Sequence, residues 1–164
     1  LFPYTTLFRS NGGVYVGTCA GAYLASEGRY SGLCFIPSLT SSETFGRGMA
    51  TMQLTPEGKD LVSRPDVPVQ LKYVNGPSLE LGVQSEAQVL ARFGNYTTLP
   101  AKPQDHPVNE GPNPLSIAAL RSNYGAGSVI LFSPHPELSP GAEEFLSNAL
   151  ISELMKRKRK EGPK

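Results

Sequence analysis

Hydrophobic residues in this chain occur in short runs that are separated by glycine, proline and polar residues. The first clear run follows Gly13, in VYVGTCAGAYLASEG, and precedes a corner of small residues and an alanine-rich segment that ends at Gly28. This order predicts a strand, a sharp turn and a helix. Four later runs predict further strands: GLCFIP (32–37), MATMQL (49–54), VPVQLKYV (67–74) and AQVLARF (87–93).

The C-terminal third contains a hairpin pattern, a proline-rich segment and a helical pattern. SIAALRS and SVILFS flank NYGAG, which predicts a β-hairpin. Segment 97–116 carries five prolines and predicts an exposed loop or lid. The last helix is expected to begin with Ser139 as its cap and Pro140 as its first residue. Leucines 146, 150 and 154 recur every four residues and predict one buried stripe on that helix.

Charge is balanced along most of the chain and concentrated at its end. The chain has 15 Lys or Arg and 14 Asp or Glu, a formal charge of +1, so no general nucleic-acid or membrane surface is expected. No apolar run approaches the length of a membrane span. The run KRKRK (156–160) is compatible with a nuclear-localisation or nucleic-acid signal. We favour a basic, solvated tail at 156–164, because cations at the end of a helix interact favourably with its dipole.

The first ten residues, LFPYTTLFRS, follow neither strand alternation nor a helical stripe. Written as codons, they resemble the end of a sequencing-library adapter, so residues 1–10 are expected to be non-native; the alternative is a native apolar arm. The inherited part then starts at Asn11, and residues 11–155 form a single domain. This leaves the native N-terminus, and with it the localisation, unknown.

Two cysteines and two histidines limit the redox and metal chemistry that we expect. Two cysteines do not form the multi-bridge framework of a small secreted protein, which favours free thiols in a reducing compartment such as the cytoplasm. His106 lies in the proline-rich segment, and no pair of these residues has metal-ligand spacing. We therefore expect no metal and no cofactor. Cys34 is interpreted as a small core residue on the predicted strand 32–37; the alternative is a redox partnership with Cys19.

The pentapeptide GTCAG (17–21) places Cys19 at the predicted corner between strand and helix. A nucleophile on such a cramped turn needs small neighbours, and the positive end of the helix dipole would lower the pKa of the thiol. The backbone N–H of Ala20 would point towards a developing oxyanion. The alternative is a buried structural cysteine, which is common in proteins.

A second candidate group, SPHPE (133–137), follows the apolar run SVILF. His135 and Glu137 therefore lie just beyond the end of a strand, where α/β proteins often place reactive groups. The imidazole would accept the thiol proton, and the carboxylate would fix the tautomer of the ring. The alternative is a surface histidine in a structural loop.

GTCAG together with SPHPE resembles the class I glutamine amidotransferase-like superfamily. Within it, the runs GGVYVGTCAGAYLAS, ETFGRGMATMQLTPEGKDLV, KYVNGP, QVLARF and GAGSVILFSPHPEL are most similar to the biotin–protein ligase N-terminal-domain family. The resemblance implies an α/β fold, a flavodoxin-like three-layer sandwich, with a parallel sheet. It also implies Cys19 as nucleophile, His135 as general base and Glu137 as its orienting acid. The implied pocket residues are Tyr23, Tyr73, Asn75 and Gly76.

The chain departs from the superfamily pattern at its start, because the strands and the glycine-rich oxyanion loop that precede the nucleophile are missing. We therefore expect an N-terminally truncated domain that is unstable or aggregation-prone when isolated. For the complete protein, two hypotheses remain. One is thiol-dependent hydrolysis of a small carboxamide substrate. The other is a catalytically silent regulatory or ligand-binding domain that acts with a separate partner domain.

Overall fold

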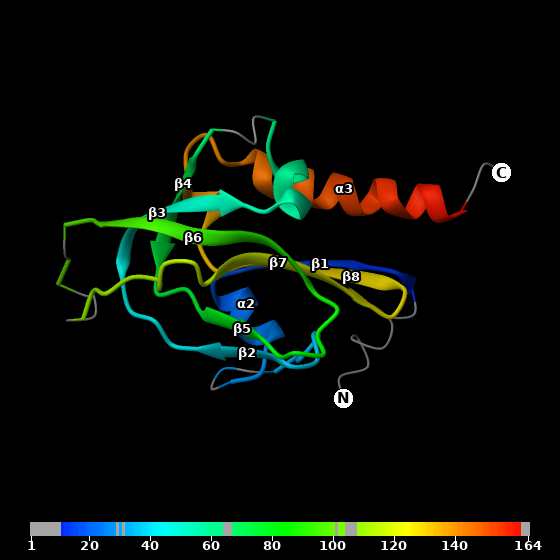
Figure 1. The fold of residues 1–164 in the computed structure, drawn as a ribbon, viewed down its shortest axis with the longest axis horizontal. Helices are drawn as coiled ribbons and strands as arrows, with labels where there is room; N and C mark the ends of the chain where they lie inside the picture. Colours follow the sequence, from blue (N-terminus) through cyan, green and yellow to red (C-terminus); the bar gives the residue numbers. More distant parts are fainter. Residues whose placement is uncertain are drawn as a thin grey trace.

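The structure is a computed structural model that describes residues 11–28, 30, 32–63, 67–100, 102–103 and 108–161. The segment 1–10 and His106 lie outside the described residues. Figure 1 shows one curved sheet with helices on both sides. The elements are β1 (Val14–Thr18), α2 (Ala20–Ala25), β2 (Leu39–Ser42), β3 (Arg47–Leu54), β4 (Val69–Val74), β5 (Ser78–Leu81), β6 (Gln88–Thr98), β7 (Ile117–Tyr124), β8 (Gly127–Phe132) and α3 (Glu144–Glu161), with short 3-10 turns η1 (Pro56–Leu61) and η2 (Pro136–Leu138).

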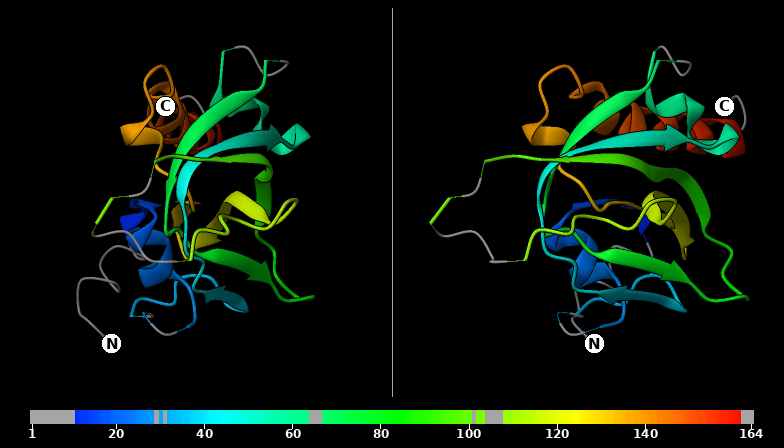
Figure 2. Two further views of the ribbon diagram at one scale, coloured as in Figure 1. Left: turned by 90° about the vertical axis from the view of Figure 1, so that its left-hand side faces the viewer. Right: turned by 60° about the vertical axis from the view of Figure 1, so that its left-hand side comes forward.

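The sheet has eight strands and is mostly antiparallel. Its main order is β1-β8-β7-β6-β3-β4, and β5 joins β2 to β7. Among the described strands, β1 and β8 form the parallel pair, whereas the remaining pairs are antiparallel. Register shifts interrupt the pairing of β6 with both of its neighbours, and Figure 2 shows the sheet curling between β3–β4 at one end and β2–β5 at the other.

The fold is therefore a mixed α/β domain, and the expectation of a flavodoxin-like parallel sheet is met only at β1 and β8. The reason lies in the connections between strands. Parallel neighbours need a long crossover, usually a helix, whereas antiparallel neighbours can be joined by a tight turn. The predicted hairpin is confirmed: β7 and β8 are antiparallel, with Tyr124 opposite Gly127 across the turn.

Most strands predicted from hydrophobic runs are present, with two kinds of error. The strand predicted after Gly13 is β1, the predictions at 49–54, 67–74 and 87–93 are confirmed by β3, β4 and β6, and the helix after the corner is α2. The strand predicted at 32–37 is wrong. Phe35 and Ile36 are buried, but they pack into the core from a loop, and Cys34 is exposed with φ 44°. Strands β2 and β5 were not predicted, because each has only four residues.

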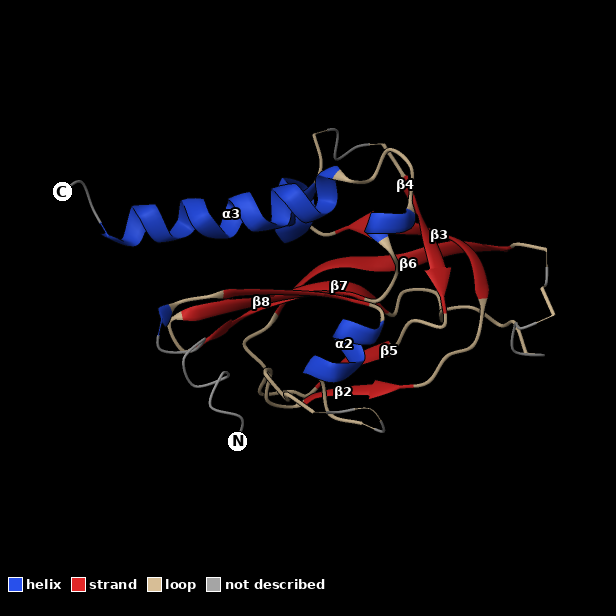
Figure 3. Ribbon diagram, turned by 180° about the vertical axis from the view of Figure 1, so that it is seen from behind, coloured by secondary structure: helices blue, strands red, loops and turns tan. Residues whose placement is uncertain are grey.

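Two hydrophobic clusters lie on opposite faces of the sheet, as alternation along β8 shows. Ile130 and Phe132 join the cluster that contains α3 residues, whereas Val129 and Leu131 join the cluster that contains α2 residues. Figure 3 shows α3 and α2 on the two sides of β7 and β8. In this part of the molecule the chain forms three layers, a helix on either side of a sheet.

The last helix begins later than predicted and buries a different face. It starts at Glu144, because the Ser139 hydroxyl is already bonded to the backbone of Lys72 and His135. The predicted leucine stripe is right only for Leu146, which packs against the core cluster, whereas Leu150 is 41% exposed and Leu154 is 46% exposed. The residues that face the core are Phe145, Ala149 and Glu153. The predicted basic tail continues this helix as far as Glu161, and Lys156 pairs with Glu153.

Candidate active site

The corner between β1 and α2 has the cramped geometry that the small residues predicted. Cys19 adopts φ 44° and ψ −100°, a sparsely populated conformation for a residue with a side chain. Its N–H donates to the carbonyl of Phe132 at 2.8 Å. A Cβ on Gly17 would lie 2.8 Å from the backbone of Gly21, so bulk is excluded on the inside of the corner. The strand-to-helix bend therefore holds the cysteine in a strained, well-defined position.

Parallel pairing brings the second sequence motif to this bend. Thr18, the last residue of β1, is opposite Phe132, the last residue of β8. The segment that follows β8 therefore lies beside the bend, although it is far downstream in the chain. A direct contact joins the two, because the Thr18 hydroxyl donates to Oε1 of Glu137 at 3.1 Å.

His135 and Glu137 form the pair that their spacing predicted. Nδ1 of His135 lies 2.6 Å from Oε1 of Glu137. The backbone N–H of His135 donates to the carbonyl of Lys72 at 2.8 Å, which ties the segment to β4. The histidine side chain is 16% exposed and that of the glutamate 35%. With Nδ1 engaged by the carboxylate, Nε2 is the ring nitrogen left for proton transfer.

The pKa of the Cys19 thiol is raised, contrary to the lowered pKa expected from the helix dipole. Sγ donates to the carbonyl of Val74 at 3.4 Å. Burial raises the pKa of the thiol, the N–H of Ala20 lowers it, and the carboxylate of Glu137 raises it further. The expectation fails because α2 has only six residues, so its dipole is small, and because desolvation dominates. Any reaction at this sulfur therefore needs a base.

Two of the predicted pocket residues, Tyr23 and Tyr73, lie within electrostatic range of Cys19 and differ in burial. Tyr23 lies on α2 at the surface of the core, where burial raises its pKa to about 12 and Cys19 lies within electrostatic range. Tyr73 is fully buried, and its hydroxyl donates to the carbonyl of Gly76 at 2.6 Å. Tyr23 is therefore the one of these two tyrosines with some exposed surface.

The turn NGP (75–77) is held by hydrogen bonds between Asn75 and Gly46. Asn75 has φ 51°, and it exchanges two hydrogen bonds of 2.9 Å with the backbone of Gly46. A Cβ on Gly76 would lie 2.2 Å from the carbonyl oxygen of Ser133, so the turn packs directly against the segment that leads to the histidine. This packing positions the carbonyl of Val74 that the thiol contacts. Neither Thr18 nor this carbonyl was singled out from the sequence, because their roles depend on neighbours in space.

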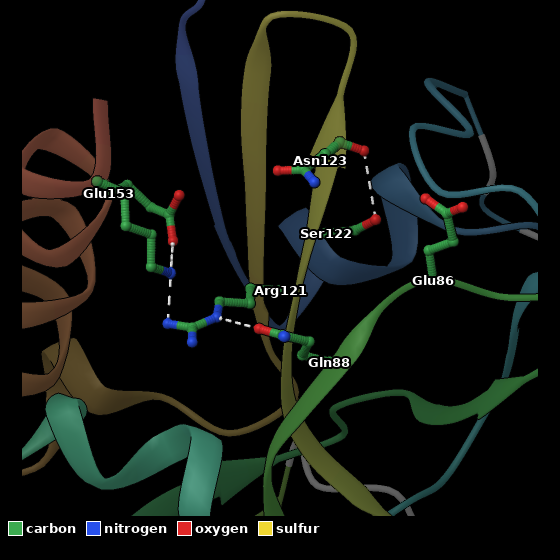
Figure 4. Close-up of a pocket in the computed structure, with 7 residues that line it drawn as sticks. Glu86, Gln88, Arg121, Ser122, Asn123 and Glu153 are labelled. Carbon is green, nitrogen blue, oxygen red and sulfur yellow. Dashed lines mark hydrogen bonds and ion pairs between the residues drawn. The ribbon is translucent and has the colours of Figure 1, made fainter. Parts of the chain in front are cut away.

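A polar pocket of about 300 Å³ lies at the other end of the sheet (Figure 4). Asn123 on β7 is opposite Ser128, which pairs in turn with Val14, so this pocket lies near the starts of β1 and β8. It is lined by Glu86, Gln88, Arg121, Ser122, Asn123, Glu153 and Lys156.

Three charged residues that line this pocket, Arg121, Glu153 and Lys156, form ion pairs. Arg121 bonds to Gln88 at 2.8 Å and to Asp60 at 3.0 Å. Burial alone would raise the pKa of Glu153, but hydrogen bonds from Lys156 and Ser128 outweigh it, and the pKa is lowered. This network links α3 to the sheet and accounts for a buried acid on the helix.

In the part of the chain that the structure describes, no cluster of three or more potential ligand residues could hold a metal ion. Within the same residues, none of the helices has the length and hydrophobicity to cross a membrane.

Comparison with known proteins finds likeness in structure alone. No family model matches the sequence, and no curated protein matches it. The chain is similar to the cytoplasmic protein STM3548 from Salmonella typhimurium, with 11% identity, a TM-score of 0.53, and coverage of 88% of this chain and 56% of that one. It is also similar to part of a beta-galactosidase from Bacillus circulans sp. alkalophilus, with 13% identity, a TM-score of 0.51, and coverage of 94% and 21%. The chain thus spans about half of the first protein, and at these identities the likeness concerns the fold.

Proposed function

We propose that the complete protein is a thiol-dependent hydrolase of the class I glutamine amidotransferase-like type, which cleaves the C–N bond of a small carboxamide. The observation that carries this proposal is the hydrogen bond from Thr18 to Glu137, because it ties the His135–Glu137 pair to the bend that carries Cys19. The sequence resemblance to that superfamily supports the same assignment. The three-layer arrangement around β1 and β8 is compatible with it.

In the proposed reaction, Nε2 of His135 accepts the proton of the Cys19 thiol, and the sulfur attacks the carboxamide carbon. The N–H of Ala20 stabilises the oxyanion that forms. The imidazolium then returns the proton to the leaving nitrogen, ammonia or an amine departs, and a thioester remains. A water molecule, deprotonated by His135, attacks the thioester, and collapse of that intermediate releases the acid and restores the thiol.

Glu137 contributes by orientation in this scheme. Its carboxylate accepts the hydrogen bond from Nδ1 of His135, which fixes the tautomer with Nε2 free and stabilises the imidazolium. Because burial raises the pKa of the Cys19 thiol, transfer of its proton to the ring is the first requirement of the proposed reaction. Tyr23 and Asn75 are the proposed contacts of the substrate, with Tyr73 and Gly76 supporting them.

A second candidate function is a catalytically silent domain that binds a ligand or a partner domain. The observation in its favour is the thiol itself, because Sγ donates to the carbonyl of Val74 and its pKa is raised. A silent domain would keep this resting contact and would not use the histidine as a base.

Alkylation of the full-length protein with iodoacetamide at pH 7, followed by peptide mass spectrometry, distinguishes the two functions. For a hydrolase, His135→Gln lowers the rate at Cys19 by at least about tenfold, because the general base is lost. The exposed Cys34 is the internal control and keeps its rate in both proteins. Equal rates at Cys19 in the wild type and the variant would support the silent domain. Ammonia release from glutamine, absent in Cys19→Ala, would identify one substrate.

A further inference from the structure

One oxygen of Glu137 is shared by two contacts, one from Thr18 and one from His135. Oε1 receives the hydroxyl of Thr18 at 3.1 Å and lies 2.6 Å from Nδ1 of His135. Thr18 immediately precedes Cys19, so consecutive residues carry the nucleophile and the anchor of the acid. The carboxylate is thus connected to the bend by one side chain and one peptide unit.

We propose that Thr18 is a positioning residue, which holds the carboxylate of Glu137 in the orientation that His135 requires. This role rests on the proposed hydrolase function. Glu137 lies on a three-residue 3-10 turn, and its side chain is 35% exposed, so solvent competes for the carboxylate. A second fixed donor restricts the rotation of the carboxylate and, through its contact with Nδ1, the orientation of the imidazole.

Thr18 is suited to this role by its position and its side-chain type. Its backbone is fixed by the parallel pairing with Phe132, and the following N–H, that of Cys19, donates to the carbonyl of the same residue. A β-branched side chain has few χ1 rotamers in a strand, so the hydroxyl has a defined direction. A longer donor would hold the acid less rigidly, because more torsions separate it from the strand.

Two substitutions separate the hydroxyl from the shape of the side chain. Thr18→Val keeps the β-branched shape and removes the donor, whereas Thr18→Ser keeps the donor. In the full-length protein, we expect Thr18→Val to slow iodoacetamide alkylation of Cys19 at pH 7 by about three- to tenfold, the effect of losing one hydrogen bond of ordinary net strength at a solvent-exposed carboxylate. Thr18→Ser should remain within about twofold of the wild type, and Cys34 again serves as the internal control.

A double-mutant cycle with Glu137→Gln tests whether Thr18 acts through the acid. If it does, Thr18→Val has no further effect once the carboxylate is gone. An equal slowing in both backgrounds, or no slowing by Thr18→Val in the wild type, would refute the positioning role. If Thr18→Val does not fold, Thr18→Ala compared with Thr18→Ser makes the same test. His135→Gln with wild-type reactivity would refute the hydrolase function instead, so the two failures are distinguishable.

Discussion

Replacing Phe145 by alanine tests the face that α3 presents to the sheet. The side chain of Phe145 is fully buried and meets the ring of Phe132 edge-on, with ring centroids 6.4 Å apart. Truncation removes these contacts and leaves a cavity, because a close-packed core collapses only partly around it. The expected loss of stability is about 3–5 kcal/mol. The matched control is Leu150→Ala on the same helix: its side chain is 41% exposed, and the expected loss is about 1 kcal/mol.

Thermal unfolding followed by circular dichroism measures both variants. For a domain of this size, 1 kcal/mol corresponds to about 2–4 °C, so Phe145→Ala is expected to lower Tm by about 6–20 °C and Leu150→Ala by only a few degrees. The leucine spacing in the sequence predicts the reverse order, with Leu150 in the core. If Leu150→Ala loses as much stability as Phe145→Ala, or more, then α3 presents a different face to the sheet and Phe145 is not its main buried side chain.

Three further predictions concern the bend, the polar pocket and the thiol. In urea unfolding, Gly17→Ala should lower the free energy of unfolding by about 1–3 kcal/mol, because the new Cβ would lie 2.8 Å from the backbone of Gly21. The control is Gly141→Ala, which has open space around it and a positive φ, and which should cost about 1 kcal/mol. Equal losses for the two variants would contradict the steric argument. The pKa of Glu153 is lower in the folded state than in the unfolded state, so its ionised carboxylate stabilises the fold at any pH above the unfolded-state pKa. This stabilisation is lost as the pH falls through the folded-state pKa of Glu153. The stability difference between wild type and Glu153→Gln should therefore shrink from about pH 5 downwards, and a difference independent of pH would refute this. Burial and then the Glu137 carboxylate raise the pKa of Cys19. In a His135→Gln background, where the carboxylate can no longer act through the imidazole, Glu137→Gln should therefore move the midpoint of the Cys19 alkylation profile to lower pH; an unchanged midpoint would exclude that direct coupling.

The local features of the candidate site could be predicted from sequence. Small residues on both sides of Cys19 predicted a cramped bend, and the backbone there has φ 44°. The spacing of His135 and Glu137 predicted a pair, and their side chains are 2.6 Å apart. These predictions succeed because each depends on a few neighbouring residues and on their covalent geometry.

The ionisation of the thiol could not be predicted in the same way. The sequence suggested a lowered pKa from the start of a helix, whereas burial and the carboxylate of Glu137 raise the pKa of Cys19. Both causes come from residues far away in the chain. The hydroxyl of Thr18 became part of the candidate site for the same reason, since its partner lies on η2.

By itself, the sequence determined where most of the strands and the bend form, because runs of apolar residues and small-residue corners act locally on the backbone. Only the tertiary structure decided which strands pair in parallel, which face of α3 is buried and how the bend meets the segment after β8. Phe145 rather than Leu150 enters the core because the direction of a helix face is set by what it packs against. The spacing of leucines along a helix is compatible with more than one buried face, and packing against the sheet determines which face of α3 is buried.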